Sequence, residues 1–236
     1  KLDGNGDDAT GNYNATSVSV SSYTSPAQHL ISYTGTESNI TYTQDKPYNN
    51  IDVEFAPDLV WIKGRNYSDS HALIDSVRGA NKILFSNSTS QQGSYSNTLT
   101  SFDNNGFTLG ADATNLVNYD TKTYVAWCWK GGGDPVSNTD GTIDSQVSAN
   151  TNAGFSIVSW TGDGNSASTV GHGLSSVPEM IITKSTSETN DWNVNHVAIP
   201  NKIVYLQGVN AAFSGGGTNG AFGYQSTNTA TTFQFT

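Results

Sequence analysis

The feature that most constrains the fold of this chain is a pattern of short segments that occurs twice. Five pairs share their order and residue class, and the two members of each pair lie 120 to 127 residues apart. The pairs are LISYTG (30–35) with IVSWTG (157–162), PDLVWIK (57–63) with PEMIITK (178–184), His71 with His196, KILF (82–85) with KIVY (202–205), and GFTL (106–109) with TFQF (232–235). Because the spacing changes little, we predict one structural unit built twice, with the length differences confined to loops.

The residues within these segments are typical of β-strands. APDLVWIKGR (56–65) is a continuous apolar run opened by a proline, which favours a buried strand. TLTSFDNNGFTLG (98–110) is typical of a hairpin, because the turn signal DNNG joins two β-rich arms. The chain has 24 glycines and 11% aromatic residues, a mixture that favours strands and polar turns over long helices. We therefore expect an all-β fold with two tandem antiparallel sandwich units.

The repeat and the local composition predict the domain boundaries. Residues 1–27 are a short lead-in at the end of a preceding domain, and residues 28–133 form the first unit. Residues 134–153 are poor in apolar residues and rich in turn formers, so we expect a linker there. The second unit, 154–236, has no counterpart of TYVAWCWK (123–130) and is incomplete at its C-terminal side. Either the full-length protein continues, or another chain or segment supplies the missing strand.

TYVAWCWK is expected to be the strand that closes the first unit. Its alternation offers two candidate buried faces: Val125, Trp127 and Trp129, or Tyr124, Ala126 and Cys128. We expect Trp61, Trp127, Cys128 and Trp129 to be structural core, and Trp127→Ala or Trp129→Ala to unfold this unit. Cys128 is the chain's only cysteine, which excludes an intrachain disulfide, and a small buried hydrophobic residue is expected there instead of a nucleophile.

Charge and hydropathy exclude several classes of function. The formal net charge is −10, with no basic patch for phosphates, so we expect no nucleic acid partner. No apolar run approaches the ~18 residues of a membrane-spanning helix, so membrane insertion is not expected.

A calcium site is the one cofactor that the sequence suggests. DGNGDD places carboxylate and amide oxygens at close intervals around glycines, so Asp3, Asn5, Asp7 and Asp8 are candidate Ca²⁺ ligands. No glutamate follows at the spacing that an EF-hand requires, and a polar turn is the alternative interpretation.

Motifs of catalytic chemistry are missing from the sequence. The four histidines show no HxH or HExxH spacing, and no Gly-x-Ser-x-Gly elbow occurs. Most acidic residues lie in turn-like contexts, among them Asp103 and Asp140. GDGNS (162–166) and GHG (171–173) are expected to be turns. We expect no enzymatic activity and a structural role for the paired histidines.

Long stretches of the chain resemble a repeat found in tail-fibre-like and other virion proteins of marine phages. The strings that carry the resemblance are APDLVWIKGR, HALIDSVRG, SFDNNGFTLG, YVAWCWKGGG and GFSIVSWTGDG, and the similarity covers roughly residues 29–236. LDGNGDDATGNYNAT (2–16) resembles the end of a laminin-G-like jelly-roll domain. The resemblance implies β-sandwiches of the jelly-roll or lectin-like kind, related to the concanavalin A and laminin-G neighbourhood. It supplies no catalytic residues, and the second unit departs from it by ending before the final strand.

We therefore expect a non-catalytic virion structural protein at the virion surface or in the extracellular space. It is a tail-fibre, appendage or surface component that attaches to host glycans or assembles subunits. A homo-oligomer or other virion proteins are the expected partners. Tyr48, Trp160, Trp192 and Tyr224 stand in polar surroundings and are candidate sugar-stacking residues, with half-buried strand ends as the alternative. A secreted bacterial carbohydrate-binding module and a purely architectural filament or capsid-decoration subunit are the alternatives.

Overall fold

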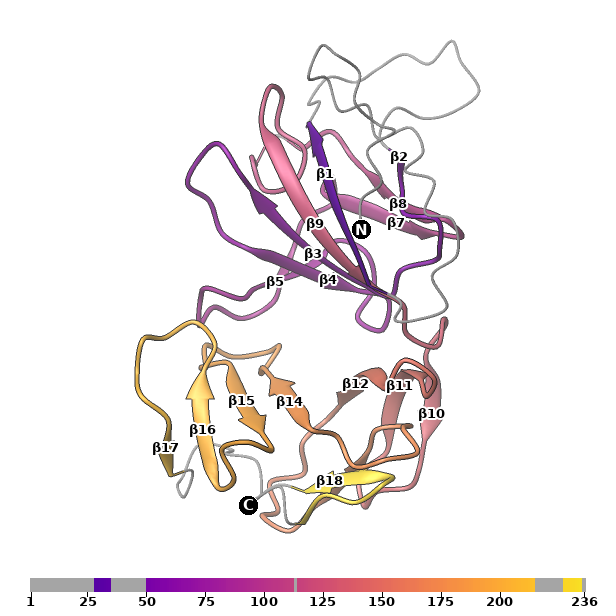
Figure 1. The fold of residues 1–236 in the computed structure, drawn as a ribbon, viewed down its shortest axis with the longest axis vertical. Coiled ribbons are helices and arrows are strands. Elements are labelled where there is room, and N and C mark those ends of the chain that lie inside the picture. The colour runs from indigo at the N-terminus through magenta and orange to yellow at the C-terminus, as the bar shows by residue number, and fades with distance from the viewer. Residues whose placement is uncertain (1–27, 35–49, 113, 215–226, 235–236) are drawn as a thin grey trace. The chain divides into compact units, whose positions relative to one another are not determined.

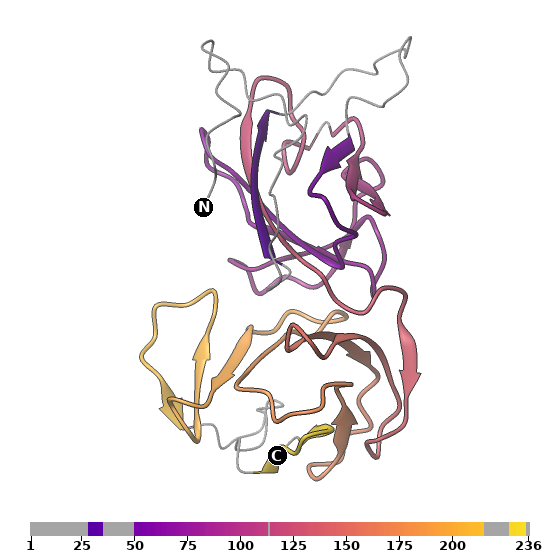
Figure 2. The same cartoon turned by 45° about the vertical axis from the view of Figure 1, so that its right-hand side comes forward.

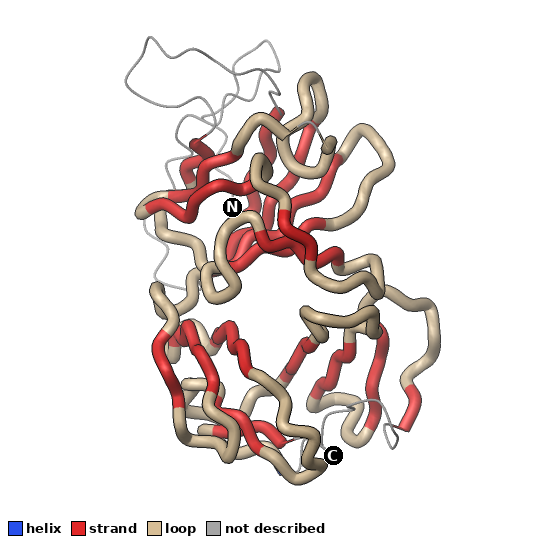
Figure 3. Tube along the Cα trace, turned by 180° about the vertical axis from the view of Figure 1, so that it is seen from behind, coloured by secondary structure: helices blue, strands red, loops and turns tan. Residues whose placement is uncertain are grey.

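A computed structural model describes residues 28–34, 50–112, 114–214 and 227–234. Within these ranges the secondary structure consists of strands joined by turns and loops, as Figure 3 shows. The strand pairs whose registers are described are antiparallel. The predicted all-β, antiparallel class is confirmed.

The chain divides into two compact units. The first comprises Lys1–Ile83 and Gly93–Lys130, and the second comprises Leu84–Gln92 and Gly131–Thr236. The segment Leu84–Gln92 therefore belongs with the second unit, although it lies in the first half of the sequence.

The first unit is built on two sheets, with strand orders β1-β9-β3-β4-β5-β6 and β2-β8-β7. The strands are β1 (Gln28–Thr34), β2 (Asn50–Asp52), β3 (Leu59–Gly64), β4 (Ala72–Asp75), β5 (Lys82–Phe85), β6 (Gly93–Ser94), β7 (Leu99–Asp103), β8 (Gly106–Leu109) and β9 (Thr123–Trp129). The strand β5 crosses the boundary, because its last two residues, Leu84 and Phe85, belong to the second unit. In Figure 2 the indigo strands β1 and β2 stand on opposite sides of this unit, so the sheets form two layers. Each sheet contributes buried apolar side chains, among them Val60 and Ile62 of β3 and Phe107 of β8.

The strand β9 lies between β1 and β3 and pairs with both (Figure 1). Its burial alternates along the strand, with Tyr124, Ala126 and Cys128 fully buried. Trp127 and Trp129 point to the opposite face and are only half-buried, because successive side chains of a strand point to opposite sides. Trp61, opposite Trp127 on β3, is half-buried as well. Of the four residues expected in the core, only Cys128 belongs to the fully buried face.

The second unit contains three sheets, with orders β10-β11-β12, β13-β18 and β14-β15-β16-β17. The strands are β10 (Val136–Asn138), β11 (Ser145–Asn150), β12 (Phe155–Trp160), β13 (Thr169–Gly171), β14 (Met180–Thr183), β15 (Asn193–His196), β16 (Lys202–Tyr205), β17 (Phe213–Ser214) and β18 (Thr232–Gln234). The expected linker, residues 134–153, contains β10 and β11, and β11 pairs along its length with β12.

Three strand pairs of the first unit have counterparts in the second. The equivalent pairs are Ile51↔Phe107 with Val170↔Phe233, Val60↔Ile74 with Ile181↔Asn195, and Lys82↔Ser94 with Lys202↔Ser214. Registers are set by which side chains face the core, so agreement at three sites indicates the same local packing in both units.

Turns of the first unit also agree with the equivalent turns of the second unit. Asn81 and Asn201 occupy the left-handed region with φ of 67° and 62°, each just before the lysine that opens β5 or β16. Ser76 N–H donates to Asp58 O at 2.8 Å in the first unit, and Val197 N–H donates to Glu179 O at 2.9 Å in the second. The same backbone turn is therefore kept with different side chains.

The registers correct one expected equivalence. Asp75 stands opposite Leu59, and His196 stands opposite Met180, the residue that matches Leu59 in the repeat. His196 therefore takes the place of Asp75, and Trp192 takes the place of His71. Matching His71 with His196 by residue type misaligned them, because the registers keep one spacing of 121 residues, both from Leu59 to Met180 and from Asp75 to His196.

His172 lies in the core of the second unit, within the predicted GHG turn. Its ring stacks on Phe233 with centroids 6.4 Å apart, and its Nδ1 accepts a hydrogen bond from Leu174 N–H at 3.1 Å. Its Nε2 lies 3.3 Å from Thr229 O, so the neutral tautomer with hydrogen on Nε2 satisfies both neighbours. Burial lowers the pKa of His172 below its ordinary value, against smaller opposing effects of the Thr229 carbonyl and Asp140.

We predict that Phe107→Ala and Phe233→Ala each destabilise their own unit by about 3–5 kcal/mol, because each removes a buried ring that pairs with an aliphatic residue on the neighbouring strand. Val209→Ala, at a fully exposed position, is the control and should change stability by less than about 0.5 kcal/mol. Urea unfolding followed by circular dichroism measures all three. A Phe233→Ala protein as stable as the control would contradict the equivalence of the two sites.

We also predict that the second unit loses stability on acidification. Because the folded pKa of His172 is lowered, the unfolded chain binds a proton near pH 6.5 while the folded chain does not. The stability is fully present above pH 6.5 and is lost as the pH falls from 6.5 toward the folded pKa. Melting curves between pH 7.5 and 5, compared with those of His172→Phe, check this. An equal pH slope in the two proteins would show that His172 is not the group responsible.

Candidate functional site

Three tryptophans share the outer face of the six-stranded sheet in the first unit. Trp127 and Trp129 lie two residues apart on β9, and Trp61 of β3 stands directly opposite Trp127. His71, just before β4, extends the group. We call these four residues the tryptophan face. It exists because β9 and β3 pair in a register that brings their outward aromatic residues side by side.

The rings of the tryptophan face form one contiguous group. The centroid of the Trp61 ring lies 5.7 Å from that of Trp127 and 6.5 Å from that of Trp129, with interplanar angles of 53° and 26°. The His71 ring lies 6.0 Å from Trp61 at 58°. These distances are in the range of favourable aromatic pairs. Each side chain is half-buried, so the group keeps some of its apolar surface accessible.

The polar groups at this face are few. The Nε1 atom of Trp61 is buried and has no hydrogen-bond partner in the described part of the chain, and such a group costs about 1–3 kcal/mol. Lys63, two residues beyond Trp61, donates from Nζ to Gly64 O at 2.7 Å. Burial, and then the charge of Lys63, lowers the pKa of His71, which keeps the imidazole neutral at pH 7. The surface is therefore largely apolar, and the cation Lys63 lies at its border.

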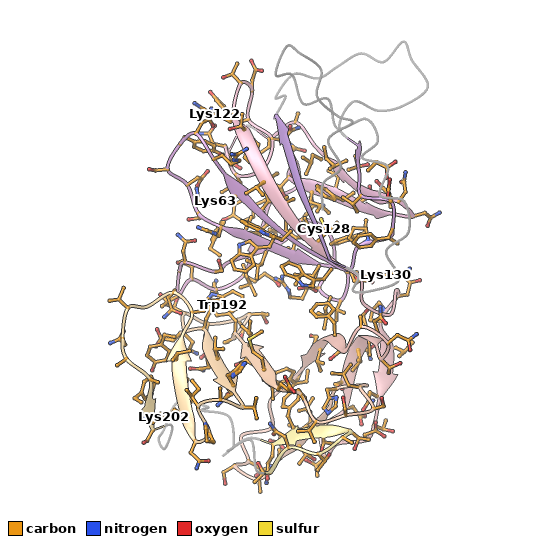
Figure 4. All side chains as sticks on the ribbon, viewed as in Figure 1. Lys63, Lys122, Cys128, Lys130, Trp192 and Lys202 are labelled. Atoms are coloured by element: carbon orange, nitrogen blue, oxygen red, sulfur yellow. The ribbon has the colours of Figure 1, made fainter. Side chains whose placement is uncertain are left out.

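Of the four residues expected to stack on sugars, the two that the structure describes, Trp160 and Trp192, do not form such a surface. Trp160 is half-buried, and its ring packs edge-on against Phe233 with centroids 5.4 Å apart. Trp192, labelled in Figure 4, is only 5% exposed, and its indole N–H donates to Phe85 O at 2.9 Å and Ser88 O at 3.1 Å. Trp192 is therefore a buried residue that anchors the segment Leu84–Gln92 within the second unit, and it is not an exposed platform. Tyr48 and Tyr224 lie outside the described residues.

The sequence already carried the signal for the tryptophan face. Period-two alternation places Trp127 and Trp129 on one side of their strand whatever the fold. Their size suggested the core, because large aromatic residues are usually well buried. The structure instead gives the core side to the smaller Ala126 and Cys128.

The proposed Ca²⁺ ligands Asp3, Asn5, Asp7 and Asp8 lie outside the described residues. Within the described ranges, no group of three or more His, Cys, Asp or Glu side chains is placed to hold a metal ion. Burial raises the pKa of Cys128 to about 12, so its thiol stays protonated at neutral pH.

Two acidic side chains order loops. Asp163, in the GDGNS turn, accepts hydrogen bonds from the Asn165 backbone and side chain and from Ser168 Oγ, and these bonds lower its pKa to about 2. Asp75 pairs with Arg78 at 2.5 Å, and Arg78 also donates to Leu73 O at 3.1 Å. Both interactions are local and stabilise turns.

Comparisons with known proteins complete the description. No curated protein and no solved structure is similar enough to this chain to count as a match. No helix in the described part of the chain is long and apolar enough to cross a membrane. The model of a family described as "Domain of unknown function (DUF7483)" matches residues 24–236. Since this match spans most of the 236 residues, the chain belongs to that family.

Proposed function

We propose that this protein is a non-catalytic structural component of a phage virion, a tail-fibre, appendage or surface protein that attaches to host-surface glycans. The observation that carries the attachment role is the tryptophan face, which groups Trp61, Trp127 and Trp129 on one side of a sheet. The virion role is supported by the resemblance of the two repeated segments to those of phage appendage proteins. The protein then acts at the virion surface, in the extracellular space.

The chemistry of the tryptophan face suits a sugar. One side of a pyranose ring presents C–H groups, which pack on indole rings as other apolar surfaces do. Hydroxyl groups at the sugar's edge need polar partners, which the neutral His71 within the face and Lys63 at its border can supply. Rings held on neighbouring strands lose little side-chain entropy on binding, which favours a sheet as the platform.

The repeated registers favour a finer architecture of two tandem antiparallel β-sandwiches of the jelly-roll or lectin-like kind. Two rigid copies in one chain suit an elongated appendage, in which function comes from display and not from catalysis. A homo-oligomer or neighbouring virion proteins would complete the assembly. A secreted bacterial carbohydrate-binding module would use the same face.

Subunit assembly is the second candidate function, and a specific observation favours it. The edge strand β14 exposes Met180 and Ile182 to 54% and 43%, an apolar edge that suits contact with another polypeptide.

The test of the attachment role is a glycan array, followed by titration of each hit against Trp127→Ala and Trp129→Ala. We expect each substitution to weaken binding about tenfold, which corresponds to about 1.4 kcal/mol of lost ring contact. Trp160→Phe is the control and should bind like the parent, because Trp160 belongs to the second unit. Because Trp127 and Trp129 are only half-buried, the structure no longer supports the expectation that either substitution unfolds the unit, and circular dichroism checks that each variant is folded. Absence of any glycan hit, or equal binding by all variants, would refute attachment through this face.

A further inference from the structure

In the first unit, one central strand joins the two halves of the main sheet. Ala126 of β9 stands opposite Ile31 of β1 on one side and Ile62 of β3 on the other. Residue pairing on both edges runs along the whole of β9. The sheet therefore depends on β9 for continuity between β1 and β3.

In the second unit, β12 and β14 take the places of β1 and β3. The repeat aligns Val158 with Ile31, and Ile181 with Val60. Val158 and Ile181 pack around the same buried cluster, which includes Phe233, so both strands cover one core. Yet β12 and β14 are end strands of separate sheets, and Figures 1 and 2 draw no described strand between them. The position of β9 has no occupant among the described residues.

The strand β14 exposes apolar side chains that a neighbouring strand would cover. Met180 and Ile182 are 54% and 43% exposed, whereas their counterparts Leu59 and Trp61, covered by β9, are half-buried. Thr183 takes the place of Ile62, and its Oγ1 atom is buried without a hydrogen-bond partner in the described ranges. A buried hydroxyl without a partner is uncommon in a finished core.

We propose that the second unit accepts an extended strand between β12 and β14, supplied by a separate partner polypeptide. The occupant runs antiparallel to both strands, as β9 does to β1 and β3. Every second side chain of this strand faces the core and is apolar or small, as Tyr124, Ala126 and Cys128 are in β9. In β9, Ala126 stands opposite Ile62, whose counterpart in the second unit is Thr183. The residue of the bound strand that corresponds to Ala126 is therefore a small hydrogen-bonding residue such as serine. The proposal does not depend on glycan binding.

The test uses the 236-residue protein and labelled peptides of the sequence Thr123–Lys130, with Cys128→Ala to prevent oxidation. We expect saturable binding by fluorescence anisotropy. Ala126→Ser in the peptide should strengthen binding about fivefold, the value of one added hydrogen bond. Ala126→Pro should weaken it at least about tenfold, because proline removes a backbone donor and does not fit a strand paired on both sides.

A protein variant makes the test specific to this position. Thr183→Ile recreates the environment of Ile62, so we expect it to prefer the alanine peptide over the serine peptide. Hydrogen exchange on the parent protein is a second measurement that does not rely on a variant. Peptide binding should protect the amides of Met180–Thr183 and leave those of the distant edge strand β17 unchanged.

Three outcomes would overturn the proposal. The first is that the peptides do not bind, or that they bind with equal affinity whether or not they carry proline. The second is that peptide binding protects the backbone amides of β17 from hydrogen exchange and not those of β14. The third is that the amides of Met180–Thr183 are already protected in the protein without peptide. Sedimentation would then show whether the protein is a monomer, in which its own chain fills the position, or a dimer, in which a second copy does.

Discussion

The pairing of β9 with two strands at once is the interaction on which the first unit depends. A strand inside a sheet uses the backbone hydrogen bonds of both edges, so it joins segments that are remote in sequence, here β1 and β3. Its inward residues, Tyr124, Ala126 and Cys128, are small apart from the tyrosine. Tyr124 adds a polar anchor at the end of the strand, because its hydroxyl lies 2.9 Å from that of Tyr67 and accepts from Tyr119 N–H at 2.9 Å.

The tryptophan face is a direct consequence of this arrangement. Once the inner face of β9 is committed to the core, alternation sends Trp127 and Trp129 outward, and the register with β3 adds Trp61. The same central strand thus stabilises the unit with one side and offers an aromatic surface with the other. A stability role and a binding role are separable here because they use different residues of one strand.

The two units differ most where they lack a common strand. Their registers agree in the β2–β8, β3–β4 and β5–β6 pairs and in the equivalent pairs of the second unit. The second unit adds β10 and β11 before β12, in a stretch that composition alone suggested was a linker. A weak sequence signal for β11 was present, since VSAN (147–150) shares its first two residues with VSSY (20–23) at the spacing of 127 residues seen for the first block. Short polar strands escape composition analysis because few of their side chains are apolar.

The sequence by itself determined the all-β class and the repeat, because strand alternation and recurring segments are properties of residue order. It also determined that Trp127 and Trp129 share a face. Only the tertiary structure decided which face of β9 enters the core, because that choice depends on the register with β1 and β3 and on the volume available between the sheets. It likewise decided that Trp192 is anchored and covered, since its hydrogen-bond acceptors Phe85 and Ser88 lie more than 100 residues earlier in the chain.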